Sequence, residues 1–113
     1  MDQGKRKLRR IRLVCSLPVT DRDTGEQLGF LEDITVEGMR VKGPSFLETG
    51  RIVHASLQLP EEIECRTEVE LDARCAWSAQ SDTPGLYDAG FMFIDTPWEA
   101  TEIIDTLIRK FQR

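Results

Sequence analysis

Hydrophobic and polar residues alternate along most of the chain as far as residue 93, as they do in strands that bury one face. The first alternating segment ends before Pro18 and predicts a strand, and the polar stretch Asp21–Glu26 predicts a hairpin-like loop. The alternating apolar positions of this first predicted strand are Ile11, Leu13, Cys15 and Leu17. Five further strands are predicted around residues 28–33, 39–41, 52–59, 65–77 and 87–93. Short strands at this spacing favour an all-β sandwich or barrel.

Glycine and proline separate these segments and predict where the chain turns. Gly43-Pro44 ends the third strand, and Ser81–Gly85 forms a loop before the last one. Pro60-Glu61-Glu62 predicts a turn between the fourth and fifth strands.

The C-terminal segment changes to helical spacing and predicts a helix over residues 97–112. Thr96-Pro97-Trp98-Glu99 has the form of a capping box, with Thr96 as the N-cap and Pro97 at the first helical position. An apolar stripe follows, made by Ile104, Leu107, Ile108 and Phe111. The stripe could recruit a partner helix, but packing on the β-unit is favoured, because a small barrel gains much of its core from one helix.

Composition narrows the class of protein. A chain of 113 residues has the size of one domain. We expect no membrane-spanning segment and no signal peptide, because no apolar run is long enough. Three cysteines, Cys15, Cys65 and Cys75, lack metal-ligand spacing, and His54 is the only histidine. We therefore expect buried packing thiols, no metal or cofactor, and a reducing cytoplasm.

Charge is distributed unevenly between the start of the chain and the rest. Residues 1–12 hold six basic side chains and one acid, a balance of +5, while residues 13–113 hold nine basic and nineteen acidic side chains, a balance of −10. An acidic body argues against a nucleic-acid polymer as the partner, since such surfaces are basic across a face. A small anionic ligand at the junction of arm and body is compatible with this pattern.

Two short motifs carry the candidate chemistry. Arg6 and Arg10 form Arg-x-x-x-Arg inside the basic run, and Asp33, Thr35 and Gly38 form Asp-x-Thr-x-x-Gly. The planar fork of arginine binds phosphate bidentately, stacks on bases and matches the guanine edge. A carboxylate accepts hydrogen bonds from guanine, and a hydroxyl both donates and accepts. Taken alone, the first motif could be a solvated tail and the second a turn.

In this order and spacing the two motifs resemble those of the PilZ family, whose members bind the bacterial second messenger cyclic di-GMP. The resemblance runs from Lys5 to the end of the chain and includes Trp77 and the segment 89–95. It implies a six-stranded antiparallel β-barrel with a C-terminal helix. It also implies ligand binding by Arg6, Arg10, Asp33, Thr35 and Gly38, with Lys5 and Arg9 as possible peripheral contacts. Thr35 replaces the serine of the family and keeps the hydroxyl.

The function expected from this resemblance is that of a cyclic di-GMP receptor acting as an adaptor. Residues 1–10 would form a flexible arm that is disordered without ligand and folds over the nucleotide, and residues 11–113 would form the domain. The changed surface would then signal to a protein partner. The alternative is a degenerate PilZ-like interaction module that binds no nucleotide. No combination of nucleophile, base and metal ligands indicates an enzyme.

Overall fold

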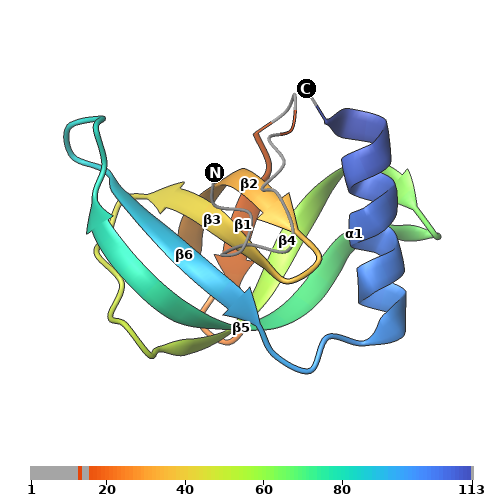
Figure 1. Cartoon of the computed structure of the whole chain (residues 1–113), viewed down its shortest axis with the longest axis horizontal. Helices are drawn as coiled ribbons and strands as arrows, with labels where there is room; N and C mark the ends of the chain where they lie inside the picture. Colours follow the sequence, from red (N-terminus) through yellow and green to blue (C-terminus); the bar gives the residue numbers. More distant parts are fainter. Residues whose placement is uncertain (1–12, 14–15, 113) are drawn as a thin grey trace, which may run out of the picture.

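The chain folds into a closed six-stranded antiparallel barrel with one C-terminal helix, and this expectation of the sequence is confirmed (Figure 1). The computed structural model describes residue 13 and residues 16–112. The strands follow the order β1-β2-β3-β6-β5-β4 around the barrel. Their bounds are β1 Pro18–Asp21, β2 Gln27–Thr35, β3 Gly38–Gly43, β4 Ile52–Ile63, β5 Arg66–Gln80 and β6 Tyr87–Phe93, with helix α1 at Trp98–Phe111.

The barrel interior is filled by alternate residues of neighbouring strands. On β4 and β5, the pairs Val53 with Ala73, Ala55 with Leu71, and Leu57 with Val69 are all buried. Side chains that pair directly across an antiparallel ladder lie on the same face of the sheet. The strict period-two pattern read from the sequence therefore identifies the inner face of this hairpin correctly.

The first described strand lies later than the strand that the sequence predicts. β1 is Pro18–Asp21; of the predicted segment 11–17, Ser16 and Leu17 belong to no strand, and residues 11, 12, 14 and 15 lie outside the described residues. Pro18 begins the strand, a position where a missing N–H is tolerated. Val19 is fully buried because it pairs with Gly29 on β2 and Leu57 on β4. Leu13 contributes an isolated bridge to Gln112 instead of a strand.

The predicted turn at Pro60-Glu61-Glu62 is also wrong. β4 continues through Pro60 to Ile63, and the chain reverses at Glu64 and Cys65, whose φ values are 52° and 64°. The ladder between β4 and β5 is irregular between Gln58 and Ile63, so the proline does not interrupt a regular set of hydrogen bonds. Cys65 is consequently exposed in the turn and is not the packing thiol expected.

The other described cysteine fulfils the expectation. Cys75 is buried, and burial raises the pKa of its thiol, which keeps the group protonated at neutral pH. Cys15 lies outside the described residues.

Helix α1 packs along the barrel, as the apolar stripe predicts (Figure 1). Its buried residues are Ala100, Ile103, Ile104 and Leu107, which touch the side of the barrel formed by β2, β4 and β5. The predicted capping box is wrong, because Pro97 is the N-cap and no side chain caps the helix. Thr96, the predicted N-cap, therefore lies one residue before the observed N-cap. Among the described residues, no helix is long and apolar enough to span a bilayer.

Candidate functional site

The β2–β3 hairpin carries the three described residues of the second motif. Thr35 pairs with Gly38, so Val36 and Glu37 form the turn of the hairpin. The Thr35 hydroxyl oxygen accepts a hydrogen bond from the Glu37 backbone N–H at 3.0 Å. Thr35 thus stabilises the turn, as expected for Asp-x-Thr segments that precede a glycine.

Gly38 is required by the strand on its other side. A Cβ atom at this position would lie 2.3 Å from the Phe91 carbonyl oxygen of β6. Phe93 donates its backbone N–H to the Glu37 carbonyl at 2.9 Å, which holds β6 against the same turn. The close approach at Gly38 is therefore made by the protein's own backbone.

Asp33 faces outward because of a β-bulge. Leu31 pairs with Val41, but Asp33 pairs with Arg40, so Glu32 is the extra residue of β2. Strict alternation from the buried Leu31 would turn Asp33 into the barrel; the bulge turns Ile34 inward instead. Asp33 is only 4% exposed, and its Oδ2 lies 3.1 Å from Arg40 Nη2. The bulge thus allows a charged motif residue to sit outside the apolar core.

Outward-facing residues form a transverse row across four strands, made by Asp33, Arg40, Gly90 and Trp77. Asp33 pairs with Arg40, Arg40 with Gly90, and Gly90 with Trp77. A Cβ atom on Gly90 would lie 2.2 Å from the Trp77 Nε1 atom, so the indole lies directly over the glycine. Trp77 remains 39% exposed. The row therefore runs from a buried carboxylate on β2 to an aromatic surface on β5.

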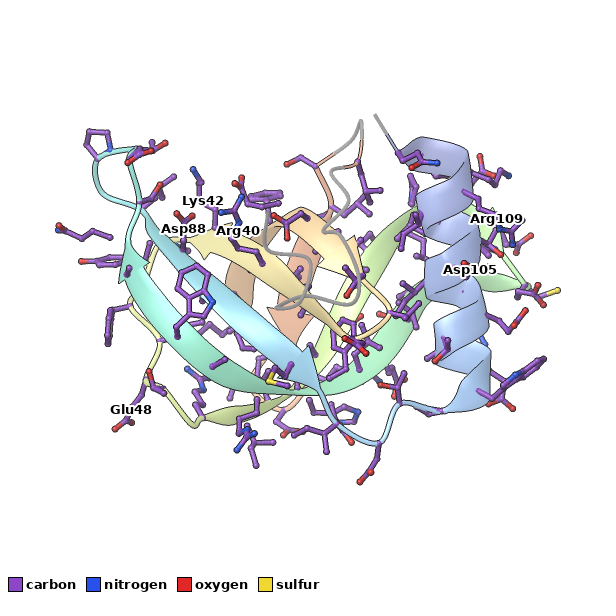
Figure 2. The ribbon with its side chains drawn as sticks, viewed as in Figure 1. Arg40, Lys42, Glu48, Asp88, Asp105 and Arg109 are labelled. Carbon is purple, nitrogen blue, oxygen red and sulfur yellow. The ribbon has the colours of Figure 1, made fainter. Side chains whose placement is uncertain are left out.

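A network of ion pairs flanks the transverse row, and Figure 2 shows Arg40, Lys42 and Asp88 together over β3 and β6. Arg40 lies 3.8 Å from Glu32, and Lys42 lies 4.0 Å from Glu32 and 3.9 Å from Asp88. Arg40 Nε and Asp88 Oδ1 are buried and make no hydrogen bond within the described part of the chain.

Sequence reasoning missed Arg40 and Lys42. Their signal is the alternation of β3 after Gly38, in which Met39 and Val41 are buried and the two cations lie between them on the outer face. The first motif is a different case. Arg6 and Arg10, with Lys5 and Arg9, lie outside the described residues, so their place relative to Asp33 stays a prediction.

Carboxylates also gather around His54, on the outer side of β4. Its ring nitrogens lie 3.8 Å from Asp23, 3.5 Å from Glu70 and 3.9 Å from Asp72. Within the described residues, no group of side chains has the arrangement needed to hold a metal ion.

A model of the PilZ domain matches residues 5–110 of the chain. No curated protein sequence matches the chain. Among solved structures, the PilZ domain of YcgR from Escherichia coli with c-di-GMP is 16% identical, with a TM-score of 0.65, and the match covers 94% of this chain and 93% of that one. The PilZ domain of CeSA from a cellulose-synthesizing bacterium is 20% identical, with a TM-score of 0.57 and coverages of 90% and 96%.

The inhibitor of motility from Bacillus subtilis is also similar, with 16% identity and a TM-score of 0.70. That match covers 93% of this chain and 51% of the inhibitor, so the chain spans about half of the larger protein. At these identities the structural neighbours show the fold.

Proposed function

Because this chain belongs to the PilZ domain family, we propose that it is a bacterial, cytoplasmic receptor for cyclic di-GMP that signals to a protein partner. The observation that carries the proposal is the second motif in its folded setting: Asp33 is held on the outer face of β2, beside Arg40. The PilZ domain of YcgR, which has the same fold, was solved with c-di-GMP. The role is that of a receptor and not of an enzyme.

The transverse row matches the chemistry of the ligand. Cyclic di-GMP presents two phosphates and two guanines. The Asp33 carboxylate can accept hydrogen bonds from the N1–H and amino groups of guanine, and Arg40 and Lys42 can donate to phosphate. The exposed side of the Trp77 indole offers a surface on which a base can stack.

The charge on the outer face of β2, β3 and β6 explains why the first motif is needed. Glu32, Asp33 and Asp88 carry three negative charges, against two positive charges on Arg40 and Lys42. A ligand with two negative phosphates is not attracted to a surface with this balance. Arg6 and Arg10, in an arm whose residues 1–10 have a balance of +4, would supply the missing positive charge over the ligand.

Binding would therefore order the arm and change the surface that a partner meets. Ordering costs roughly 1–2 kcal/mol per residue in backbone entropy, so the affinity is moderated and the arm works as a switch. Amide hydrogen exchange of residues 7–12 tests this step. We expect protection only with cyclic di-GMP, and equal protection with and without it would eliminate the switch.

The second candidate function is a PilZ-like interaction module without nucleotide binding. It is favoured by one observation: Thr35, Gly38 and Asp33 each have a structural role in the fold itself, in the turn, against β6 and with Arg40. A chain that had lost its ligand would retain these residues.

Titration calorimetry with cyclic di-GMP at physiological salt separates the two functions. We expect binding in the micromolar range or tighter, about −8 kcal/mol or better. GMP lacks the bridged phosphates and cyclic di-AMP lacks the guanine edge, so both should bind much more weakly. Absence of heat and of competition with excess cyclic di-GMP would favour the module.

A further inference from the structure

Three residues on the outer face of the barrel form a second exposed surface next to the transverse row, which we call the Arg74 patch: Ile52, Arg74 and Met92. Ile52 on β4 pairs with Arg74 on β5, and Arg74 pairs with Met92 on β6. The three side chains therefore stand in one line across three strands. On the far side of Met92 the line continues to Gly38, which has no side chain to cover it.

The apolar members of the Arg74 patch are unusually exposed. Ile52 is 66% exposed and Met92 is 53% exposed, and Trp77 lies in the adjoining row over Gly90. Large apolar side chains gathered on one sheet face, bordered by polar residues, mark a protein interaction surface more often than isolated ones do. Methionine and arginine are also enriched at such interfaces.

Arg74 gives this surface a preference for one sign of charge. Of the eight lysines and arginines in the described part of the chain, six form ion pairs with carboxylates, and Arg66 and Arg74 form none. Asp72 is the nearest acid on the same face of β5, and its carboxylate lies 3.9 Å from His54. Arg74 is thus an exposed cation between two exposed apolar side chains, and within residues 16–112 no carboxylate forms an ion pair with it.

We propose that the Arg74 patch is a docking surface for a protein segment that presents a carboxylate flanked by apolar side chains. Such a segment pairs its acid with the Arg74 guanidinium and covers Ile52 and Met92. A second copy of this chain is a poorer occupant, because a two-fold axis through the patch brings two Arg74 side chains toward each other. The inference does not depend on nucleotide binding, and it assigns the face on which a partner meets the barrel.

Selection of a random twelve-residue peptide library on the nucleotide-free chain tests the proposal. We expect the enriched peptides to carry Asp or Glu next to Leu, Ile, Met or aromatic residues. Their binding is then measured by fluorescence anisotropy against two variants, Arg74→Glu and Arg66→Glu. Arg66 is the matched control, because it is an exposed cation on the same strand, also without an ion pair among the described residues.

Arg74→Glu should weaken binding of the selected peptides about tenfold or more, and Arg66→Glu should leave it unchanged. A selected peptide whose acids are replaced by lysine should bind the Arg74→Glu variant more tightly than it binds the unsubstituted protein. Met92→Ser should weaken binding without altering the charge preference, and melting curves confirm that each variant is folded. No enrichment, enrichment without acids, equal binding to Arg74→Glu, or dimers of the chain in light scattering would each overturn the proposal.

Discussion

Two buried aspartates on neighbouring strands of this barrel each contact an arginine. Asp33 on β2 is 4% exposed and 3.1 Å from Arg40; Asp21 at the end of β1 is 5% exposed and 3.2 Å from Arg51. The Asp21 Oδ1 atom accepts the Asp23 backbone N–H at 2.8 Å, and its carbonyl accepts that of Gly25. Asp21 therefore holds the β1–β2 loop closed.

The surroundings of the two pairs differ more than the pairs do. Near Asp21 and Arg51 lie three further acids, Glu26, Glu68 and Glu70, and Arg22 pairs with the last two. Asp33 shares the outer face with Arg40, Lys42, Glu32 and Asp88, and its row of residues ends in Trp77 over Gly90. A buried Asp–Arg pair is thus no sign of a ligand site by itself; the motif and the aromatic surface in the same row distinguish Asp33 from Asp21.

The largest effect is expected from filling the space between β3 and β6. Gly38→Ala places a Cβ atom against the Phe91 carbonyl, and we expect the free energy of unfolding to fall by about 3 kcal/mol. Gly25→Ala, in the loop closed by Asp21, meets no atom within 4 Å and should cost only about 1 kcal/mol, because its φ is positive. Urea unfolding of both variants measures the difference, and equal losses would contradict the packing role of Gly38.

The arm motif gives the next largest effect, on binding alone. Arg6→Ala and Arg10→Ala should each weaken cyclic di-GMP binding by about 1.5–3 kcal/mol, tenfold to a hundredfold. Lys7→Ala removes the same charge from the same arm without touching the motif, so it should have a much smaller effect. The melting temperature should not change. Normal binding by both arginine variants, or a loss of folding, would show that the motif is not the ligand site.

Exchanging each aspartate for its amide compares the two sides directly. Asp33→Asn should weaken cyclic di-GMP binding about tenfold, because the amide no longer offers two acceptor oxygens to guanine. Asp21→Asn should lower the free energy of unfolding by about 1–3 kcal/mol and leave binding unchanged. Calorimetry measures the binding affinity of both variants, and urea unfolding measures their free energies of unfolding. Equal loss of binding in the two variants would remove the distinction between the two sides.

The smallest effect concerns acid stability on the Asp21 side. A hydrogen bond from the Ser56 hydroxyl lowers the pKa of Glu68, with a smaller contribution from Arg22. A lowered carboxyl pKa stabilises the fold at pH values above its ordinary value, 4.5, and this contribution is lost as the pH falls through the folded pKa.

Ser56→Ala should therefore lower stability slightly at neutral pH and flatten the loss of stability below pH 4.5, by well under 1 kcal/mol because the Glu68 side chain is 44% exposed and screened by solvent. Thermal unfolding at neutral and acidic pH measures it. A steeper loss of stability at acidic pH in the variant would mean that Ser56 does not stabilise the charged form of Glu68.

The sequence predicts this fold well wherever alternation is uninterrupted. The inner positions of β4 and β5 follow directly from residue spacing. Of the stripe predicted on α1, Ile104 and Leu107 are buried, and Ile108 and Phe111 are partly buried against the core. The errors lie where a local signal competes with long-range pairing. In the sequence, Pro18 and Pro60 predict interruptions, yet Pro18 begins β1 and Pro60 lies in an irregular part of β4. Proline stops pairing only where its missing N–H is needed.

The candidate site was predictable in part. Asp33, Thr35 and Gly38 are recognisable as a motif, but the bulge at Glu32 that turns Asp33 outward depends on pairing with β3 and has no local signal. The same holds for Gly90 beneath Trp77, which is set by the register of β5 against β6. Arg40 and Lys42 become visible only when β3 is paired on both sides.

The most direct test of the central claim is a map of amide chemical shifts during titration with cyclic di-GMP. We expect large changes at Asp33, Gly38, Arg40 and Gly90 and at the Trp77 indole N–H, together with the resonances of the arm. We expect no significant change around the Asp21–Arg51 pair. Changes centred on Asp21 and Arg51, or no changes at saturating nucleotide, would contradict the assignment of the site to the outer face of β2, β3 and β6.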